Sequence, residues 1–257
     1  MGACTVRHVT FTLLAFFLTS NPGRSEASDA ASALYNEGNA LYRQGAYEAA
    51  IDRYQDVVGS GIRNPDVYYN LGNAYFKAGA LGQALLNYER ARRLAPSDPD
   101  ISGNVAFANT LKVDRFDIDA PNAVTRFLSA IYTRLSPNGL AAWVSFSFLG
   151  ICFGLAGLLF LPGRRVRWFV VLGVASLGCV LSIALLTVKV DELNTPKGIV
   201  LVPETVGRSG PSSDYLQVFT LHEGTLVVLE RQEGQWGLIR LPNGIGGWIQ
   251  LETFGMI

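Results

Sequence analysis

Two uncharged apolar runs in the second half of the chain constrain its structure more than any other feature. Residues 139–161 and 168–188 contain no Asp, Glu, Lys, Arg or His. A helix needs about 20 apolar residues to cross the ~30 Å hydrocarbon layer of a membrane, so each run is long enough to span it. The segment 162–167 between them is too short for more than a turn. The sequence therefore predicts a two-helix transmembrane hairpin.

The basic residues of the turn predict the side of the membrane. Arg164, Arg165 and Arg167 all fall between the two runs, and basic residues in short loops are retained on the cytoplasmic side. Both ends of the hairpin would then lie outside the cytoplasm. Because neither run holds an ionisable residue, a transporter or proton channel is disfavoured.

Small residues stand four positions apart in each run. Gly150 and Gly154 belong to the first run, and Gly178 and Ser182 belong to the second. Such pairs let helices approach closely. Two uses are open at this point, packing of the hairpin on itself and contact with a partner subunit.

Charge and cysteine usage exclude several classes of protein. The formal net charge is zero, without long basic or acidic runs, so no nucleic acid partner is predicted. Cys152 and Cys179 lie within the apolar runs, as free thiols or as a bridge, and Cys4 lies near the N-terminus. The parts predicted to face water therefore have no disulfide framework or metal cage.

The segment 1–27 has the features of a secretory signal peptide. Arg7 precedes a short apolar core at 11–18, and small residues follow at Ser25-x-Ala27. An uncleaved anchor is the alternative. In both cases the next residues emerge on the extracytoplasmic side, in agreement with the arginines of the turn.

A repeat with a period of 34 residues occupies 31–98. The period, together with its small and aromatic positions, resembles the tetratricopeptide repeat (TPR), in which each repeat is a helix A followed by a helix B. Glycine early in each repeat would let the two helices approach closely. Seven residues recur unchanged at this offset: Asn36, Gly38, Asn39, Ala40, Gly45, Ala50 and Tyr54, which return as Asn70, Gly72, Asn73, Ala74, Gly79, Ala84 and Tyr88.

The TPR resemblance implies a groove for a protein or peptide partner. Asparagine amides can hold a ligand backbone with a donor and an acceptor together, and basic side chains suit a carboxylate. The alternative is that the asparagines bond within the stack while the basic residues are solvated. The helix A positions that would line the groove are Asn36, Asn39 and Arg43 in the first repeat and Asn70, Asn73 and Lys77 in the second.

Two further helices are predicted between the repeats and the hairpin. In 99–120, Ile101 and Val105 indicate a capping helix followed by a linker, since a repeat stack needs its apolar end covered. The glycine and aromatic residues of the repeat do not recur in this segment, which argues against a third repeat. In 121–137, Phe127 and Ile131 share one face, which is typical of an amphipathic helix in the membrane interface; packing on the cap is the alternative.

The C-terminal segment 198–257 alternates short strand signals with turn residues. Its segments 219–225 and 244–249 are similar to bacterial SH3 domains, which implies a small SH3-like β-barrel with Trp236 and Trp248 packed in its core; a role of these tryptophans as platforms for a ligand is the alternative. The predicted strands are Ile199–Val202, Gln217–Thr220, Thr225–Glu230, Trp236–Leu241 and Gly247–Gln250.

Catalytic motifs are missing from the sequence. His222 is the only histidine outside the predicted leader, and His222-Glu223 lacks the second histidine of a zinc-protease motif because Leu226 stands in its place. We expect His222 to be a turn residue. The sequence predicts a protein that is not an enzyme and has no cofactor or metal.

The order of these parts, a signal, two TPRs, a membrane hairpin and an SH3-like domain, resembles the BatE proteins of bacterial aerotolerance (Bat) operons. The most specific shared segments are Asn-x-Gly-Asn-Ala in each repeat and Phe-Thr-Leu-His-Glu-Gly-Thr at 219–225. Membership would imply work beside von Willebrand A-type membrane proteins and a MoxR-type ATPase at the inner membrane.

The overall prediction is a multidomain α + β membrane protein: a TPR solenoid of two repeats with a capping helix, a transmembrane hairpin at 139–161 and 168–188, and an SH3-like barrel. Its expected role is a scaffold for Bat-type subunits on the extracytoplasmic face of the inner membrane. The alternative is an envelope anchor whose SH3-like domain binds peptidoglycan through Tyr215, Phe219 and Phe254.

Overall fold

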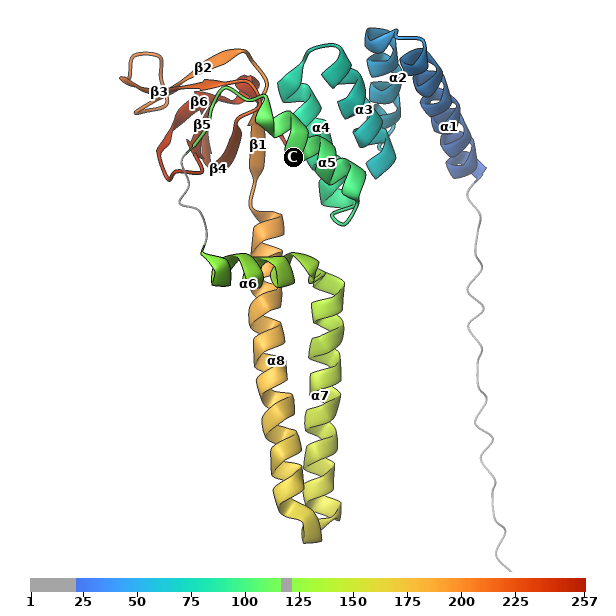
Figure 1. Ribbon diagram of the computed structural model, residues 1–257, viewed down its shortest axis with the longest axis vertical. Helices are drawn as coiled ribbons and strands as arrows, with labels where there is room; N and C mark the ends of the chain where they lie inside the picture. Colours follow the sequence, from blue (N-terminus) through green and yellow to red (C-terminus); the bar gives the residue numbers. More distant parts are fainter. Residues whose placement is uncertain (1–21, 117–121) are drawn as a thin grey trace, which may run out of the picture.

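The computed structural model describes residues 22–116 and 122–257, so most of the predicted signal peptide lies outside the described residues. A stack of short helices (22–110) is followed by a hairpin of two long helices (137–194), and the chain ends in a β-sheet (197–256). The stack and the sheet lie side by side at one end of the hairpin (Figure 1).

Residues 22–116 form five helices joined by tight turns. Gly45 and Gly79 follow the first helix of each repeat with φ of 80° and 83°, a conformation that favours glycine. Asn64 and Asp98 cap the helices that begin at the next residue, which is proline in both cases. The helices are α1 (Pro22–Arg43), α2 (Tyr47–Gly59), α3 (Pro65–Lys77), α4 (Leu81–Leu94) and α5 (Pro99–Thr110).

The glycines of the repeat allow each helix A to rest on a tyrosine of its helix B. A Cβ atom on Gly38 would lie 2.8 Å from the ring of Tyr54, and one on Gly72 would lie 2.6 Å from the ring of Tyr88. Both tyrosines are almost fully buried. The TPR helical repeats expected from the sequence are therefore present, with the predicted glycine and tyrosine positions in direct contact.

Helix α5 has the position of a helix A in a third repeat, which sequence reasoning missed. No second helix follows it within 111–116, and Ala106 stands where the two repeats have glycine. The cap, the first proline and the buried face nevertheless recur at the same offset: Asn64, Pro65, Val67, Leu71 and Ala74 correspond to Asp98, Pro99, Ile101, Val105 and Ala108.

The hairpin consists of α7 (Pro137–Phe160), a short turn η1 (Pro162–Arg164) and α8 (Arg165–Asn194). By length and composition, these two helices are the ones in the described residues that could cross a membrane. The two apolar helices are confirmed, although the turn is shorter than 162–167 because α8 already begins at Arg165. Cys152 and Cys179 are free thiols, so they form no bridge.

Helix α6 (Ala123–Arg134) runs across the hairpin at the end nearest the stack and sheet (Figure 1). Its residues Val124, Phe127 and Ile131 are exposed rather than packed on the cap. The helix is tied to the end of α8, because the Tyr132 hydroxyl donates to Glu192 at 3.0 Å and the Lys189 ammonium lies 4.3 Å from the centre of the Tyr132 ring.

Residues 197–256 form one antiparallel sheet of seven strands in the order β3-β2-β6-β5-β4-β1-β7. Five of these strands overlap the predicted ones. Sequence reasoning missed β2, which contains poor strand formers, and β7, which has three residues. The strands are β1 (Lys197–Val200), β2 (Glu204–Arg208), β3 (Gln217–His222), β4 (Leu226–Glu233), β5 (Trp236–Arg240), β6 (Gly246–Gln250) and β7 (Phe254–Met256).

The prediction of a closed barrel is wrong. Strands β3 and β7 stand at the two edges of the sheet, and they do not pair with each other within the described residues. Both edges are met by the helical part instead. The His222 N–H of β3 donates to the Asp114 carboxylate at 2.7 Å, and the Met256 carbonyl of β7 accepts from Arg90. Within the described part of the chain, each edge strand is therefore bonded to the helical part at its last residue and not to the other edge strand.

The sheet packs against the side of α4. Ile199 of β1 belongs to the same buried cluster as Leu85 and Leu86 of α4 and Val105 of α5. Complete burial of one leucine contributes about 1.5–3 kcal/mol of transfer free energy. The apolar end of the helical stack is therefore covered by α5 together with the sheet.

Candidate functional site

A repeated network of amides and tyrosine hydroxyls runs through the helix A row of the stack. In its first copy, the Asn70 amide donates to the Tyr35 hydroxyl at 2.8 Å and to Asn39 Oδ1 at 3.1 Å. The Tyr54 hydroxyl also donates to Asn39 Oδ1, at 2.7 Å. The asparagines predicted to line a groove are therefore also part of the packing between helices.

The second copy of the network uses the residues 34 positions later. The Asn104 amide of α5 donates to the Tyr69 hydroxyl at 3.1 Å and to Asn73 Oδ1 at 2.9 Å, and the Tyr88 hydroxyl donates to Asn73 Oδ1 at 2.8 Å. Asn104 was absent from the predicted site. The recurrence of asparagine at positions 36, 70 and 104 was the signal that could have found it.

The network borders a hollow between α1, α2 and α3, which we term the amide hollow. Among the predicted groove residues, the structure brings four together there. The hollow is lined by Asn39, Tyr42, Arg43, Tyr54, Asn70 and Asn73. Asn36 lies in the adjacent hollow beside Tyr35, and Lys77 is exposed at the end of α3 without lining either one.

The amide hollow keeps hydrogen-bonding capacity for a ligand. The network uses the Oδ1 atoms of Asn39 and Asn73 and the Nδ2 atom of Asn70. Within 22–116 and 122–257 these bonds leave the Nδ2 groups of Asn39 and Asn73 and the Oδ1 atom of Asn70 without a protein partner. Donors and an acceptor of this kind match the N–H and C=O groups of an extended peptide.

Burial keeps the tyrosines of the network neutral. It raises the pKa of Tyr54 to about 12 and raises the pKa of Tyr88 as well, with neighbouring tyrosines adding to the effect. Both hydroxyls therefore remain donors at neutral pH. The exposed Arg43 is then the charged group that lines the hollow, and a guanidinium suits a carboxylate.

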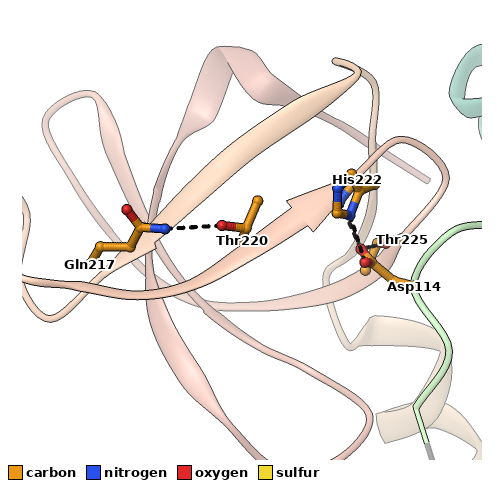
Figure 2. A network of polar contacts seen from close by, with 5 residues as sticks. All are labelled: Asp114, Gln217, Thr220, His222 and Thr225. Atoms are coloured by element: carbon orange, nitrogen blue, oxygen red, sulfur yellow. Dashed lines mark hydrogen bonds and ion pairs between the residues drawn. The ribbon is translucent and has the colours of Figure 1, made fainter.

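A second polar cluster joins the stack to the sheet. Asp114, in the segment after α5, accepts the His222 N–H at 2.7 Å and the Thr225 hydroxyl at 2.5 Å, and its other oxygen lies 2.8 Å from His222 Nδ1 (Figure 2). Burial alone would raise the pKa of Asp114, but the bonds from Thr225 and His222 together hold it below the ordinary value.

Glu223 makes a further tie between the same two parts. Its carboxylate accepts the N–H of Gly82 at 2.7 Å, in the first turn of α4, where helix N–H groups lack partners inside the helix. The sequence analysis expected His222 to be a turn residue, but it is the last residue of β3, and the turn begins at Glu223. In the structure both connect the sheet to the stack, across more than a hundred residues of chain.

The small residues of the hairpin pack its two helices on each other. A Cβ atom on Gly154 would lie 2.8 Å from Leu172, and one on Gly150 would lie 3.2 Å from the Cβ atom of Ala175. Gly178 faces Ser147. The closest approach involves Gly157, against the ring of Trp168, which the sequence analysis did not single out. Ser182 is half-buried on α8.

The three arginines stay together at the far end of the hairpin. Arg164 lies in η1, whereas Arg165 and Arg167 lie in the first turn of α8, and all three are exposed. Figure 1 shows this end as the most distant part of the hairpin from the stack and the sheet.

A comparison with protein families agrees with the helical geometry. A tetratricopeptide repeat model matches residues 17–65 and again residues 35–99. No curated protein matches the chain. The chain therefore contains tetratricopeptide repeats, which precede a hairpin of two apolar helices and an antiparallel sheet.

Proposed function

We propose that this chain is a membrane-anchored adaptor, not an enzyme, that holds a protein partner on its TPR stack. The main support for this proposal is the amide hollow. Amide atoms of Asn39, Asn70 and Asn73 that have no protein partner within the described residues lie there beside the exposed Arg43. That combination suits an extended peptide segment with an acidic side chain or a terminal carboxylate.

The anchor in this proposal is the hairpin α7–α8, with α6 in the interface. About 20 apolar residues fill the hydrocarbon layer, and the exposed apolar side chains of both helices would face lipid. Arg164, Arg165 and Arg167 favour a cytoplasmic turn. The stack and the sheet would then lie on the extracytoplasmic face, as the predicted signal peptide also requires.

The resemblance to BatE proteins suggests the class of partner. Under this proposal the partner is a membrane protein of the von Willebrand A type in a Bat-type envelope complex. The SH3-like character of the sheet belongs to the same proposal, supported by the segment Phe219–Thr225. Its contacts with α4 and Asp114 suggest that it holds the stack in place beside the membrane.

Variants of exposed basic residues test the groove without disturbing the stack. Asn39 and Asn73 are poor probes, because each accepts two hydrogen bonds that join helices. We expect Arg43→Glu to reduce co-purification of membrane partners from a mild detergent at least about tenfold, since the attractive charge that lines the hollow becomes repulsive. Arg63→Glu, in the loop between α2 and α3, is the matched control. Equal partner recovery with all three proteins would refute the groove.

Labelling of single cysteines tests the orientation. With the native cysteines replaced by alanine, a cysteine at Val166, in the first turn of α8 beside the hairpin turn, should resist an impermeant thiol reagent in spheroplasts. A cysteine at Asp214, in an exposed loop of the sheet, should react. The opposite labelling pattern would place the stack and the sheet in the cytoplasm.

The alternative role, an anchor that binds peptidoglycan through the sheet, finds less support. Of the three aromatic residues expected to grip a ligand, Phe254 is buried and Phe219 packs over Gly207 and Gly247. Tyr215 alone of the three is exposed. Sedimentation of the intact protein with purified peptidoglycan in detergent would revive this role.

A further inference from the structure

A cavity opens where the stack, the end of α8 and the sheet meet, and we term it the junction cavity. Basic side chains from three elements line it: Arg92 and Arg93 of α4, Lys189 of α8 and Lys197 of β1. Two acidic side chains, Glu89 and Glu192, line it as well. The lining side chains thus carry four positive and at most two negative charges.

The two acidic side chains of the junction cavity pair with two of its four basic side chains. Arg92 pairs with Glu89 at 2.6 Å, and Lys189 pairs with Glu192 at 3.5 Å. Arg93 instead donates to main-chain oxygens of Leu193 and Ile257. Lys197 has no ion pair within the described residues. Burial also raises the pKa of Glu89, which disfavours its negative form.

The junction cavity lies at the height expected for lipid headgroups. The uncharged run 168–188 fills the hydrocarbon layer, and Lys189 is the next residue of α8. Helix α6 crosses α8 close to this level (Figure 1), and its Tyr132 contacts both Lys189 and Glu192 of the cavity wall. The junction cavity therefore lies next to the level expected for the boundary between membrane and water.

We propose that the junction cavity binds the phosphate headgroup of an anionic phospholipid. Guanidinium and ammonium groups are the donors that recognise phosphate, and the apolar Leu193 and Leu226 in the wall suit the first carbons of the acyl chains. This inference rests on the proposed membrane anchor. A bound lipid would then fix the stack and the sheet at a constant height above the membrane.

Native mass spectrometry of the full chain in a neutral detergent tests the site. Phosphatidylglycerol, phosphatidylcholine and inorganic phosphate are added separately at equal phosphate concentration. We expect phosphatidylglycerol to bind with at least about tenfold higher affinity than either of the others, because basic residues near a membrane surface favour anionic lipid by roughly fivefold each.

Charge-removing variants locate the binding. Lys197→Gln should weaken phosphatidylglycerol binding about fivefold, and Lys197→Gln with Arg92→Gln should weaken it about 30-fold. The single variant breaks no ion pair, so it stays informative if the double variant fails to fold. Arg63→Gln with Arg231→Gln is the matched control, because it also removes one unpaired and one paired basic side chain, outside the cavity.

Each other outcome overturns the proposal in a distinct way. Equal affinity for the two lipids would mean that no headgroup site exists, and equal binding of inorganic phosphate would make the cavity a site for free phosphate. An unchanged affinity in Lys197→Gln would place the lipid elsewhere. Failure of the anchor itself would appear separately, as release of the protein from membranes by alkaline carbonate, and failure of the adaptor role would appear in the partner recovery described above.

Discussion

The stack and its junction with the sheet are held together by the same kinds of contact, arranged in opposite ways. Inside the stack, every main contact occurs twice at an offset of 34 residues: glycine on tyrosine, tyrosine hydroxyl on asparagine, asparagine on asparagine. At the junction, Asp114 with His222 and Glu223 with Gly82 each occur once, between residues more than a hundred positions apart. Repetition makes the first set visible in sequence, whereas the second set leaves no pattern.

The comparison also concerns stability. A solenoid is stabilised by contacts between neighbouring repeats, so its last repeat depends on whatever covers it. Here the cover is partly a sheet that the chain reaches only after passing through the hairpin. The junction should therefore matter to the second repeat as much as the first repeat does.

Truncation of buried leucines compares the two regions most strongly. Leu71→Ala opens the core between the repeats, and Leu85→Ala opens the cluster shared with the sheet. Each should lower the free energy of unfolding by about 2–5 kcal/mol. Hydrogen exchange should then accelerate in α1 and α3 for the first variant and in α4 and β1 for the second. Normal protection of β1 in Leu85→Ala would mean that the sheet is only loosely attached.

A glycine pair tests the close approach inside the stack. In Gly72→Ala the new Cβ would lie 2.6 Å from the Tyr88 ring, and the overpacking should cost about 1–3 kcal/mol of stability. Gly103→Ala in α5 is the matched control, because its Cβ meets open space and alanine favours a helix by about 0.5–1 kcal/mol. The midpoint temperature of thermal unfolding should fall for Gly72→Ala and rise for Gly103→Ala. A similar shift for both would mean that the Tyr88 ring moves aside for the new Cβ atom at little cost.

Loss of the Asp114 carboxylate tests the junction through pH. Asp114→Asn should cost about 1–3 kcal/mol at neutral pH, because it weakens bonds to two partly buried donors. The pKa of Asp114 is lowered in the folded state, so its stabilisation is present above the ordinary aspartate value of about 3.9 and disappears as the pH falls below it. Urea unfolding should show a steeper acid loss for the wild type than for the variant. Parallel curves of stability against pH for the two proteins would show that the Asp114 carboxylate does not stabilise the junction.

Removal of one tyrosine hydroxyl tests the network of the stack and has the smallest expected effect. Tyr54→Phe should cost about 0.5–1.5 kcal/mol through the bond to Asn39. The raised pKa of Tyr54, about 12, means that its contribution is complete below the ordinary tyrosine value of about 10 and is lost as the pH rises from there toward 12. The variant should therefore lose stability less steeply in alkali. An identical alkaline slope would indicate that the hydroxyl is solvated.

Much of the helical architecture and part of the candidate site could be predicted from sequence. The offset of 34 located Gly38, Tyr54, Asn39 and their equivalents, and the absence of charge located both long helices. The amides of Asn39 and Asn73 were predicted as groove residues, with bonding inside the stack as the alternative. In the structure their oxygens serve the stack, while their Nδ2 groups stay without a protein partner. The sequence pattern cannot distinguish hydrogen bonding inside the stack from ligand binding, because it does not show which amide atom faces the neighbouring helix.

The sequence by itself determined the repeat unit, the hairpin and the sheet, because periodicity and hydropathy are local properties that each segment carries alone. The tertiary structure decided that the sheet stays open, that Asp114 and Arg90 meet its edges, and that four basic side chains gather beside the end of α8. Those features depend on segments distant in the chain that come together only when apolar surface is buried between α4 and β1. A contact that occurs only once produces no periodic pattern in the sequence, so it can be seen only in the tertiary structure.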